Sequence, residues 1–200
     1  AINLTCVNSS VTQSNHDCET SDAICGAITV TGNSTGPGLN STCGSCNLSE
    51  NFSNWYKFEI TSSGRLELVI APITVTDDYD FALYQTNDCS NLGAPVRCSY
   101  AANTGNTGMN VTESDIFEDV TGNGWVDAIN VQEGDIFYLM VNKWSAGGNG
   151  YNLSFNFTEG GGMDCSILPI ELTSFKANCN NGIVQIEWEV LSEQNNNYFI

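Results

Sequence analysis

The clearest pattern in this chain is the alternation of apolar and polar residues between positions 54 and 84. Residues 55–60 and 65–70 each place an apolar side chain at every second position, and residues 79–84 repeat this after an acidic turn. A period of two is typical of half-buried β-strands. Pro72 ends the second run, because proline cannot donate to a sheet ladder. The segment therefore predicts three short strands in a meander.

Two later segments strengthen the β assignment. Residues 136–141 form a nearly continuous apolar run, which predicts a central strand. In residues 151–158 the apolar positions alternate with polar ones, so Asn152 and Asn156 should face solvent. Residues 99–124 are polar and rich in Gly, Asn and Thr, which predicts long loops. Together these patterns predict an all-β fold, a disulfide-stapled antiparallel β-sandwich of the jelly-roll or CUB-like kind.

A Gly-rich stretch at residues 159–162 predicts a linker and divides the chain into residues 1–162 and 163–200. Residues 168–177 and 182–190 read as two further strands. Two strands cannot bury an apolar face by themselves. We therefore expect the second segment to dock on the first domain or to pair with another subunit.

The charge of the chain is strongly one-sided. Five basic residues face 23 acidic ones, for a net charge of −18. This excess argues against nucleic acid and anionic membrane surfaces as partners, because both are bound through Lys and Arg. No apolar run approaches the ~20 residues of a membrane span. Many carboxylates lack a basic partner, which makes bound cations plausible.

Nine cysteines indicate an oxidising environment outside the cytoplasm. Cys89 and Cys98 flank a short loop with Gly93 and Pro95, which predicts a Cys89–Cys98 disulfide. Cysteines 18, 25, 43 and 46 could form structural disulfides or a four-thiolate zinc site, and disulfides are the favoured interpretation. The odd count leaves at least one thiol free or paired with another chain.

Nine Asn-x-Ser/Thr sequons are candidate glycosylation sites. They begin at Asn3, Asn8, Asn33, Asn40, Asn47, Asn51, Asn110, Asn152 and Asn156. A surface that is simply rich in Asn, Ser and Thr is the alternative interpretation.

Candidate chemistry is sparse, and no catalytic centre is predicted. His16 is the only histidine and has no evident partner for nucleophilic catalysis. Asp77, Asp78 and Asp80 cluster at a strand entry and predict a possible calcium site. Four acids in later loops could complete it: Asp115, Glu118, Asp119 and Asp127. Four aromatic residues could stack on sugar rings: Trp55, Tyr100, Trp125 and Trp144.

The C-terminal part of the sequence resembles a known module. The residues concerned are Leu168–Ala177, Val184–Trp188, Ser192–Glu193 and Asn197–Ile200. They are similar to the opening of a fibronectin-type module found near the C-termini of surface proteins exported by the type IX secretion route of gliding bacteria. The resemblance covers residues 166–200 and implies an incomplete Ig/fibronectin-like module.

Residues 15–158 resemble the β-sandwich that precedes such modules, which is loosely related to bacterial pre-peptidase C-terminal and CUB-like domains. The likeness rests on Trp55–Phe58, Gly64–Leu66, Asp77–Tyr84, Arg97–Ala102 and Gly122–Val131. It implies surface display and a binding or structural role.

These observations predict a non-catalytic, secreted cell-surface protein. In the leading hypothesis it is a glycosylated filament subunit or adhesin building block that self-associates by strand pairing through its C-terminal segment. The alternative is a carbohydrate-binding accessory module of a secreted hydrolase.

Overall fold

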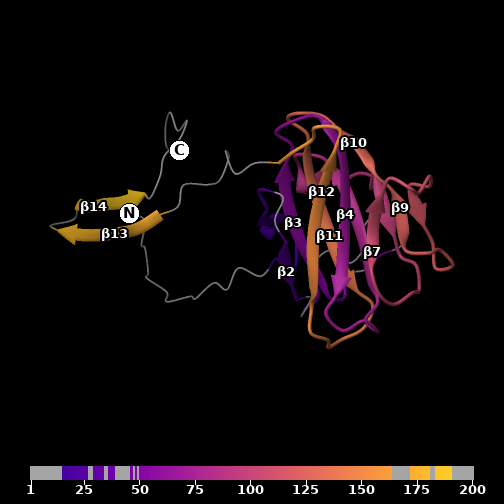
Figure 1. Cartoon of the computed structure of the whole chain (residues 1–200). Coiled ribbons are helices and arrows are strands. Elements are labelled where there is room, and N and C mark those ends of the chain that lie inside the picture. Colours follow the sequence, from indigo (N-terminus) through magenta and orange to yellow (C-terminus); the bar gives the residue numbers. More distant parts are fainter. Residues whose placement is uncertain are drawn as a thin grey trace. The chain divides into compact units, whose positions relative to one another are not determined.

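The computed structural model describes residues 15–26, 29–33, 36–38, 46, 48, 50–163, 172–180 and 183–190 (Figure 1). The chain divides into two compact units, residues 1–163 and 164–200. The described part of the first unit contains two β-sheets and two short 3-10 turns, η1 (Cys18–Thr20) and η3 (Cys89–Asn91). The all-β sandwich that the sequence predicts is therefore confirmed.

The first sheet has six strands, in the order β1-β3-β11-β5-β6-β8. Their bounds are β1 Asp22–Ala23, β3 Ser53–Glu59, β11 Ile136–Lys143, β5 Tyr79–Gln85, β6 Arg97–Ser99 and β8 Phe117–Glu118. The apolar strand β11 lies in the middle, as expected, and pairs antiparallel with both β3 and β5. Short parallel pairs, β1 with β3 and β8 with β6, finish the two edges.

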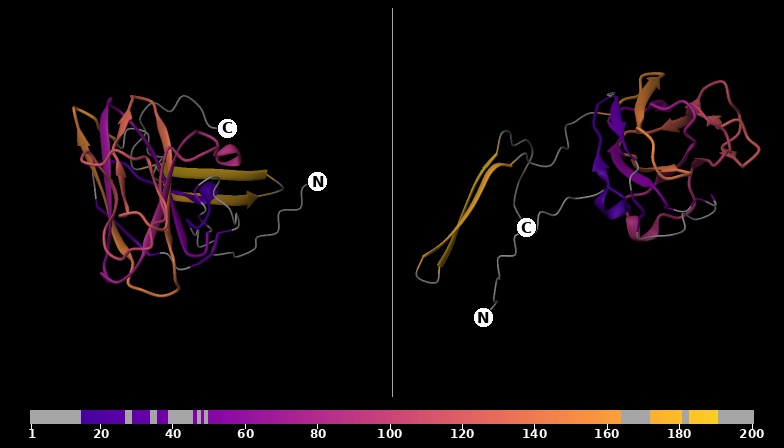
Figure 2. Two further views of the ribbon diagram at one scale, coloured as in Figure 1. Left: turned by 90° about the vertical axis from the view of Figure 1, so that its right-hand side faces the viewer. Right: turned by 90° about the horizontal axis from the view of Figure 1, so that it is seen from below.

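The second sheet has the order β2-β12-β4-β7-β9, and β10 also pairs with β4. Its bounds are β2 Val30–Gly32, β12 Tyr151–Thr158, β4 Gly64–Pro72, β7 Thr107–Asn110, β9 Trp125–Asp127 and β10 Ile129–Val131. Figure 2 shows the ribbon from two further sides. Residues 99–124 thus contribute β7 and β8, so the prediction that they form only loops is wrong.

The predicted meander is also wrong. β3 and β5 lie in the first sheet, whereas β4, which stands between them in sequence, lies in the second. Each strand has one strongly apolar face, and all three faces meet in the core between the sheets. The alternation of side chains specifies which face is buried but not which strand is the hydrogen-bonded neighbour, and that is why the pairing was missed.

Aromatic residues from both sheets fill the core between them. The hydroxyl groups of Tyr56 on β3 and Tyr151 on β12 form a hydrogen bond of 2.8 Å across it. The Phe58 ring lies 5.4 Å from that of Phe137 and 5.2 Å from that of Phe155, measured between ring centres. These side chains are all at least nine-tenths buried. Such contacts between the layers hold the two sheets together.

The outer face of the first sheet is covered as well. Trp55, which the alternation places on the exposed side of β3, is only 1% exposed and stacks on Tyr84, with ring centres 5.8 Å apart. Cys18, Cys46 and Leu48 from the N-terminal segment lie in the same buried cluster. These residues of the Cys-rich segment therefore form a third layer over this sheet.

Two disulfides for which both cysteines are described fasten that layer, and neither is the predicted Cys89–Cys98 bond. Cys18 is bonded to Cys89, with Cα atoms 5.7 Å apart, and Cys46 is bonded to Cys98, with Cα atoms 6.2 Å apart. Cys98 lies on β6 opposite Ala82 of β5, on the outer face, so it meets the covering segment rather than the nearby Cys89. The bonds span 71 and 52 residues, and closing such loops stabilises the fold by roughly 4 kcal/mol each in the chain-entropy model.

Cys25 is also disulfide-bonded. Because Cys18, Cys25 and Cys46 are oxidised, a four-thiolate zinc site that needs them does not form, and the disulfide interpretation is confirmed for these three. Cys43 lies outside the described residues. Disulfides of this kind persist in oxidising compartments, which supports an extracellular location. In the described part of the chain, no helix is long and apolar enough to cross a membrane.

The second unit contains an antiparallel hairpin, β13 (Leu172–Asn180) and β14 (Ile183–Val190). Its register pairs Phe175 with Trp188 and Ala177 with Ile186, and shifts between Leu172 and Ser174. The two strands predicted from the sequence are therefore present. A lone hairpin is marginally stable in water.

Candidate functional site

A cavity of about 430 Å³ opens on the outer face of the first sheet. Its walls combine carboxylates, amides, aromatic rings and aliphatic side chains. The lining residues are Leu48, Asn51, Asp78, Asp80, Tyr100, Ala102, Val120, Asn142 and Trp144. They come from the ends of β5, β6 and β11 and from the segments beside these strands.

Strand register builds the floor of the cavity. Asp80 on β5 lies directly opposite Asn142 on β11. Their neighbours Phe81 and Val141 point into the core between the sheets, so the pleat turns Asp80 and Asn142 to the outer face. The side-chain oxygen of Asn142 accepts a hydrogen bond from the backbone N–H of Phe52, at 3.2 Å. The NH₂ group of Asn142 is therefore the part of this amide that can serve a ligand.

The two carboxylates sit in an unusual electrostatic environment. Asp80 is only 3% exposed, and burial, reinforced by the negative charge of Asp78, raises its pKa to about 8. Burial also raises the pKa of Asp78. One oxygen of Asp78 is fully buried and has no hydrogen-bond partner among the described residues. Burial thus favours a proton on Asp80 over a second full negative charge beside Asp78.

Aromatic rings stand beside these acids. Trp144 follows β11 and is 71% exposed, and its backbone N–H donates to the carbonyl oxygen of Asp78 at 3.2 Å. Tyr100 follows β6, is half-buried, and packs edge-on against Phe117, with ring centres 5.5 Å apart. The site therefore presents apolar rings next to buried acceptors.

The covering layer supplies one wall. Leu48 is 5% exposed and lies two residues after Cys46, whose disulfide to Cys98 ties this stretch to β6. On the other side, the backbone N–H of Ala102 donates to the carbonyl oxygen of Val120 at 3.2 Å. The cavity thus depends on the disulfide-fastened segment as well as on the sheet.

The predicted calcium ligands do not come together as one group. Asp77 forms an ion pair with Lys143, with 3.1 Å between the nitrogen and oxygen atoms, while Asp78 and Asp80 line the cavity. Within the ranges that the structure describes, no three His, Cys, Asp or Glu side chains are grouped so that they could hold a metal ion. The three-aspartate site is therefore not formed, because Lys143 engages the first of its members.

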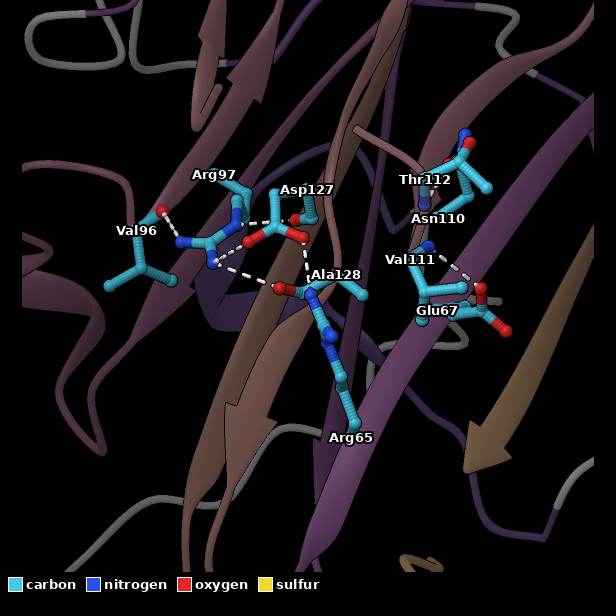
Figure 3. Close-up of polar contacts among 9 residues, drawn as sticks. All are labelled: Arg65, Glu67, Val96, Arg97, Asn110, Val111, Thr112, Asp127 and Ala128. Atoms are coloured by element: carbon cyan, nitrogen blue, oxygen red, sulfur yellow. Dashed lines mark hydrogen bonds and ion pairs between the residues drawn. The ribbon is translucent and has the colours of Figure 1, made fainter. Parts of the chain in front are cut away.

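The later acids do not complete such a site either. Asp127 lies between two arginines: its carboxylate is 2.5 Å from Arg65 and 3.9 Å from Arg97 (Figure 3). Arg97 also donates to the carbonyl oxygens of Val96, Asp127 and Ala128. Asp119 accepts hydrogen bonds from the backbone and hydroxyl of Thr121 in its own turn. These contacts are structural.

The remaining sequence candidates separate clearly. Trp55 is buried and donates through its indole N–H to Glu50 at 2.6 Å, so it cannot stack on a ligand. Trp125 is half-buried on β9, and only Trp144 and Tyr100 line the cavity. The Nδ1 atom of His16 lies 2.7 Å from the backbone carbonyl oxygen of Ser53.

The predicted exposure of Asn152 and Asn156 on β12 is confirmed. Asn33 and Asn51 are also exposed, and Asn110 is half-buried and accepts hydrogen bonds from Thr112. Asn3, Asn8, Asn40 and Asn47 lie outside the described residues. Glycosylation at these sites stays a prediction.

Comparisons with known proteins show a structural likeness but no matching family. No family model matches the chain, and no curated protein matches it. Among solved structures it is similar to the pre-peptidase C-terminal domain of the collagenase from Bacillus anthracis, with a TM-score of 0.41 and 16% identity over 68% of this chain and 94% of that one. That domain type is one of the two that residues 15–158 resemble. The resemblance of residues 166–200 to type IX and fibronectin-type sequences stays a prediction.

Proposed function

We propose that this protein is a non-catalytic extracellular module that binds carbohydrate in the cavity beside Trp144. The observation that carries the proposal is an exposed indole next to buried polar groups in one concave site. The apolar face of a sugar ring can pack on Trp144 and Tyr100. Its hydroxyl groups can donate to Asp78 and Asp80 and accept from the NH₂ group of Asn142. This division between apolar walls and a few convergent polar groups is typical of small-ligand sites.

The arrangement of the two acids favours binding over hydrolysis. A glycosidase places two carboxyl groups on either side of the scissile bond. Asp78 and Asp80 are two residues apart in one segment, so both reach the ligand from the same side of the cavity. His16 contacts the backbone carbonyl oxygen of Ser53 and does not line the cavity.

A glycan array probed with the full chain tests the proposal, followed by titration of each glycan that binds. We expect Trp144→Ala to weaken binding on the order of tenfold, because an aromatic contact contributes about 1 kcal/mol or more. Val111→Ala is the matched control: Val111 is exposed and apolar but does not line the cavity. An array without any binder, or binding that Trp144→Ala leaves intact, would refute the proposal.

A second function, self-assembly, is supported by the hairpin β13–β14. Its two strands pair only with each other in the described structure, so each has an edge without a described neighbour. Such an edge can pair with a strand of another copy of this chain. N–H groups of neighbouring residues point to opposite edges. One of the variants Gln185→Pro and Ile186→Pro therefore removes an outward donor and should reduce assembly, as measured by sedimentation, whereas Gln185→Ala should not. Unchanged assembly in both proline variants would exclude the hairpin.

A further inference from the structure

The cavity contains acidic groups that no basic residue of its lining compensates. Asp78 and Asp80 are its two charged residues, and Lys, Arg and His are absent from the described lining. The nearest basic residue in sequence, Lys143, pairs with Asp77 and donates to the carbonyl oxygen of Gly147. It follows Asn142 on β11, so the pleat turns it to the opposite face of the sheet.

The other basic side chains of the first unit are also occupied elsewhere. Arg65 and Arg97 both bind Asp127. The ammonium group of Lys57 lies over the ring of Tyr138, 5.4 Å from its centre. The described structure therefore offers the cavity no internal cation.

The lack of a cation matters most for Asp80, because its carboxyl group is buried. Its side chain is more than nine-tenths buried, it lines the cavity, and no hydrogen bond or ion pair to it is formed within the described residues. A buried oxygen of Asp78 is unpartnered as well. A buried carboxylate without a partner is unfavourable unless it takes up a proton or a cation.

We infer that the cavity selects glycans that carry a free primary amine, with the ammonium group between Asp78 and Asp80 and the sugar ring against Trp144 and Tyr100. This inference rests on the proposed function and names the sugar class. An ammonium group has three N–H donors, which suits the oxygens of two carboxylates. Aromatic faces attract cations as well, so the rings and the acids favour the same ligand.

A metal ion fits the site less well. Calcium requires six to eight oxygen ligands in close coordination, whereas much of the lining is aromatic or aliphatic, including Leu48, Ala102 and Val120. The elevated pKa of Asp80 is compatible with an amine ligand, because a proton occupies the place that an ammonium group would take. The titratable groups that face this place are Asp78, Asp80 and Tyr100.

The test compares two matched ligands by calorimetry at pH 6.5 with the full chain: a β-1,4-linked glucosamine oligomer and its fully N-acetylated counterpart. We expect the amine form to bind at least about tenfold more tightly. Asp80→Asn should remove most of this preference and keep the weak binding of the N-acetylated form. A thermal melt of this variant, with a cooperative transition, checks that it is folded.

A matched control separates local from long-range attraction. Glu133→Gln removes one negative charge from an exposed position. Glu133 precedes the first residue of β11, whereas Asn142 lies near the last residue of that strand. It should leave the preference unchanged. Equal loss in both variants would mean that the net charge of −18, rather than the cavity, attracts the amine, and would overturn the inference.

The outcomes also distinguish this inference from the function on which it rests. If both oligomers bind equally and Trp144→Ala abolishes both, the amine preference is wrong and the carbohydrate function stands. If neither binds and a lysine-containing peptide binds in an Asp80-dependent manner, the ligand is a protein and both statements are overturned. If no ligand of these classes binds, both are likewise refuted.

Discussion

The backbone N–H of Trp144 donates a hydrogen bond to the backbone carbonyl oxygen of Asp78, with 3.2 Å between the two atoms. The bond joins the end of β11 to the residues that lead into β5. It therefore holds an exposed ring and two acids at the same end of the sheet. Because only main-chain atoms form it, substitution of Trp144 by alanine keeps the bond. A change in binding in that variant reports on the ring itself.

The two disulfides should differ in their effect on the cavity. Replacing Cys46 and Cys98 together by serine should lower the free energy of unfolding by roughly 3 to 4 kcal/mol. It should also weaken ligand binding, because Leu48 loses the covalent attachment that holds it in the wall. Urea denaturation and ligand titration measure the two effects separately.

The matched control is the Cys18–Cys89 disulfide. Replacing Cys18 and Cys89 by serine opens a bond that spans 71 residues, so the loss of stability should be similar. Neither cysteine lines the cavity, and ligand affinity in the folded variant should stay within about twofold of that of the unmodified protein. Equal losses of affinity in both variants would contradict the assigned role of the Cys46–Cys98 bond.

The sequence predicts the strands of this fold better than their neighbours. The inward faces of β3 and β4 follow from the alternation of apolar and polar residues. Tyr56 and Leu66 each belong to a run in which every second residue is apolar. The partner of β3 is β11, which lies far away in sequence, and nothing in either strand's pattern specifies that pairing. The disulfide pairing could not be predicted for the same reason. Cys98 meets Cys46 only because an N-terminal layer crosses the outer face of the first sheet.

The candidate site shows the same limit. Asp80 and Trp144 are both recognisable in the sequence, one as a possible metal ligand and the other as a possible sugar platform. Their combination in one cavity depends on the register of β5 and β11, which places Asp80 opposite Asn142. The ion pair between Asp77 and Lys143 could not be predicted from the sequence, because the two residues are far apart in the chain and meet only in the fold. The carbonyl oxygen of Gly147 helps to position the lysine by accepting a hydrogen bond from it.

The hydrogen bond between Tyr56 and Tyr151 should stabilise the contact between the two sheets. Tyr151→Phe leaves the buried hydroxyl of Tyr56 without this partner and should lower the free energy of unfolding by about 1 to 2 kcal/mol. The variant with both tyrosines replaced by phenylalanine should lose less than the sum of the single losses, because the Tyr56–Tyr151 hydrogen bond is lost once in the double variant but is counted in both single losses. Urea denaturation of the three variants completes the cycle. Strictly additive losses would contradict the coupling.

Asp127 should stabilise the fold by neutralising Arg65 and Arg97 at the same time. Asp127→Asn keeps the shape of the side chain but removes the charge, and should cost about 1 kcal/mol because the groups are partly exposed. Glu133→Gln is the control: it removes one negative charge from an exposed position where no arginine of the described structure pairs with the side chain, and it should cost less. High salt should reduce the cost of Asp127→Asn. A cost that is equal in both variants would show that the arginines gain nothing from Asp127.

The pH dependence of stability tests the burial of Asp80. Its pKa rises from the ordinary aspartate value in the unfolded chain to about 8 in the folded protein. Between about pH 4 and pH 8 the folded state therefore holds a proton that the unfolded state has released, so this residue lowers stability as the pH rises. Asp80→Asn removes that contribution. The variant should match the unmodified protein at pH 4 and exceed its free energy of unfolding by at least about 1 kcal/mol at pH 8.5.

The comparison is made as a difference between the two proteins at each pH, so that the contributions of acids that do not interact with Asp80 cancel. Asp135→Asn is a poor control, since Asp135 caps its own turn through the N–H of Gln132; Glu133→Gln is the suitable one and should give no trend with pH. A variant Asp80→Asn that is less stable at every pH would mean that the charged carboxylate has a favourable partner in the fold. The cavity would then lack the uncompensated charge on which its preference for an amine depends.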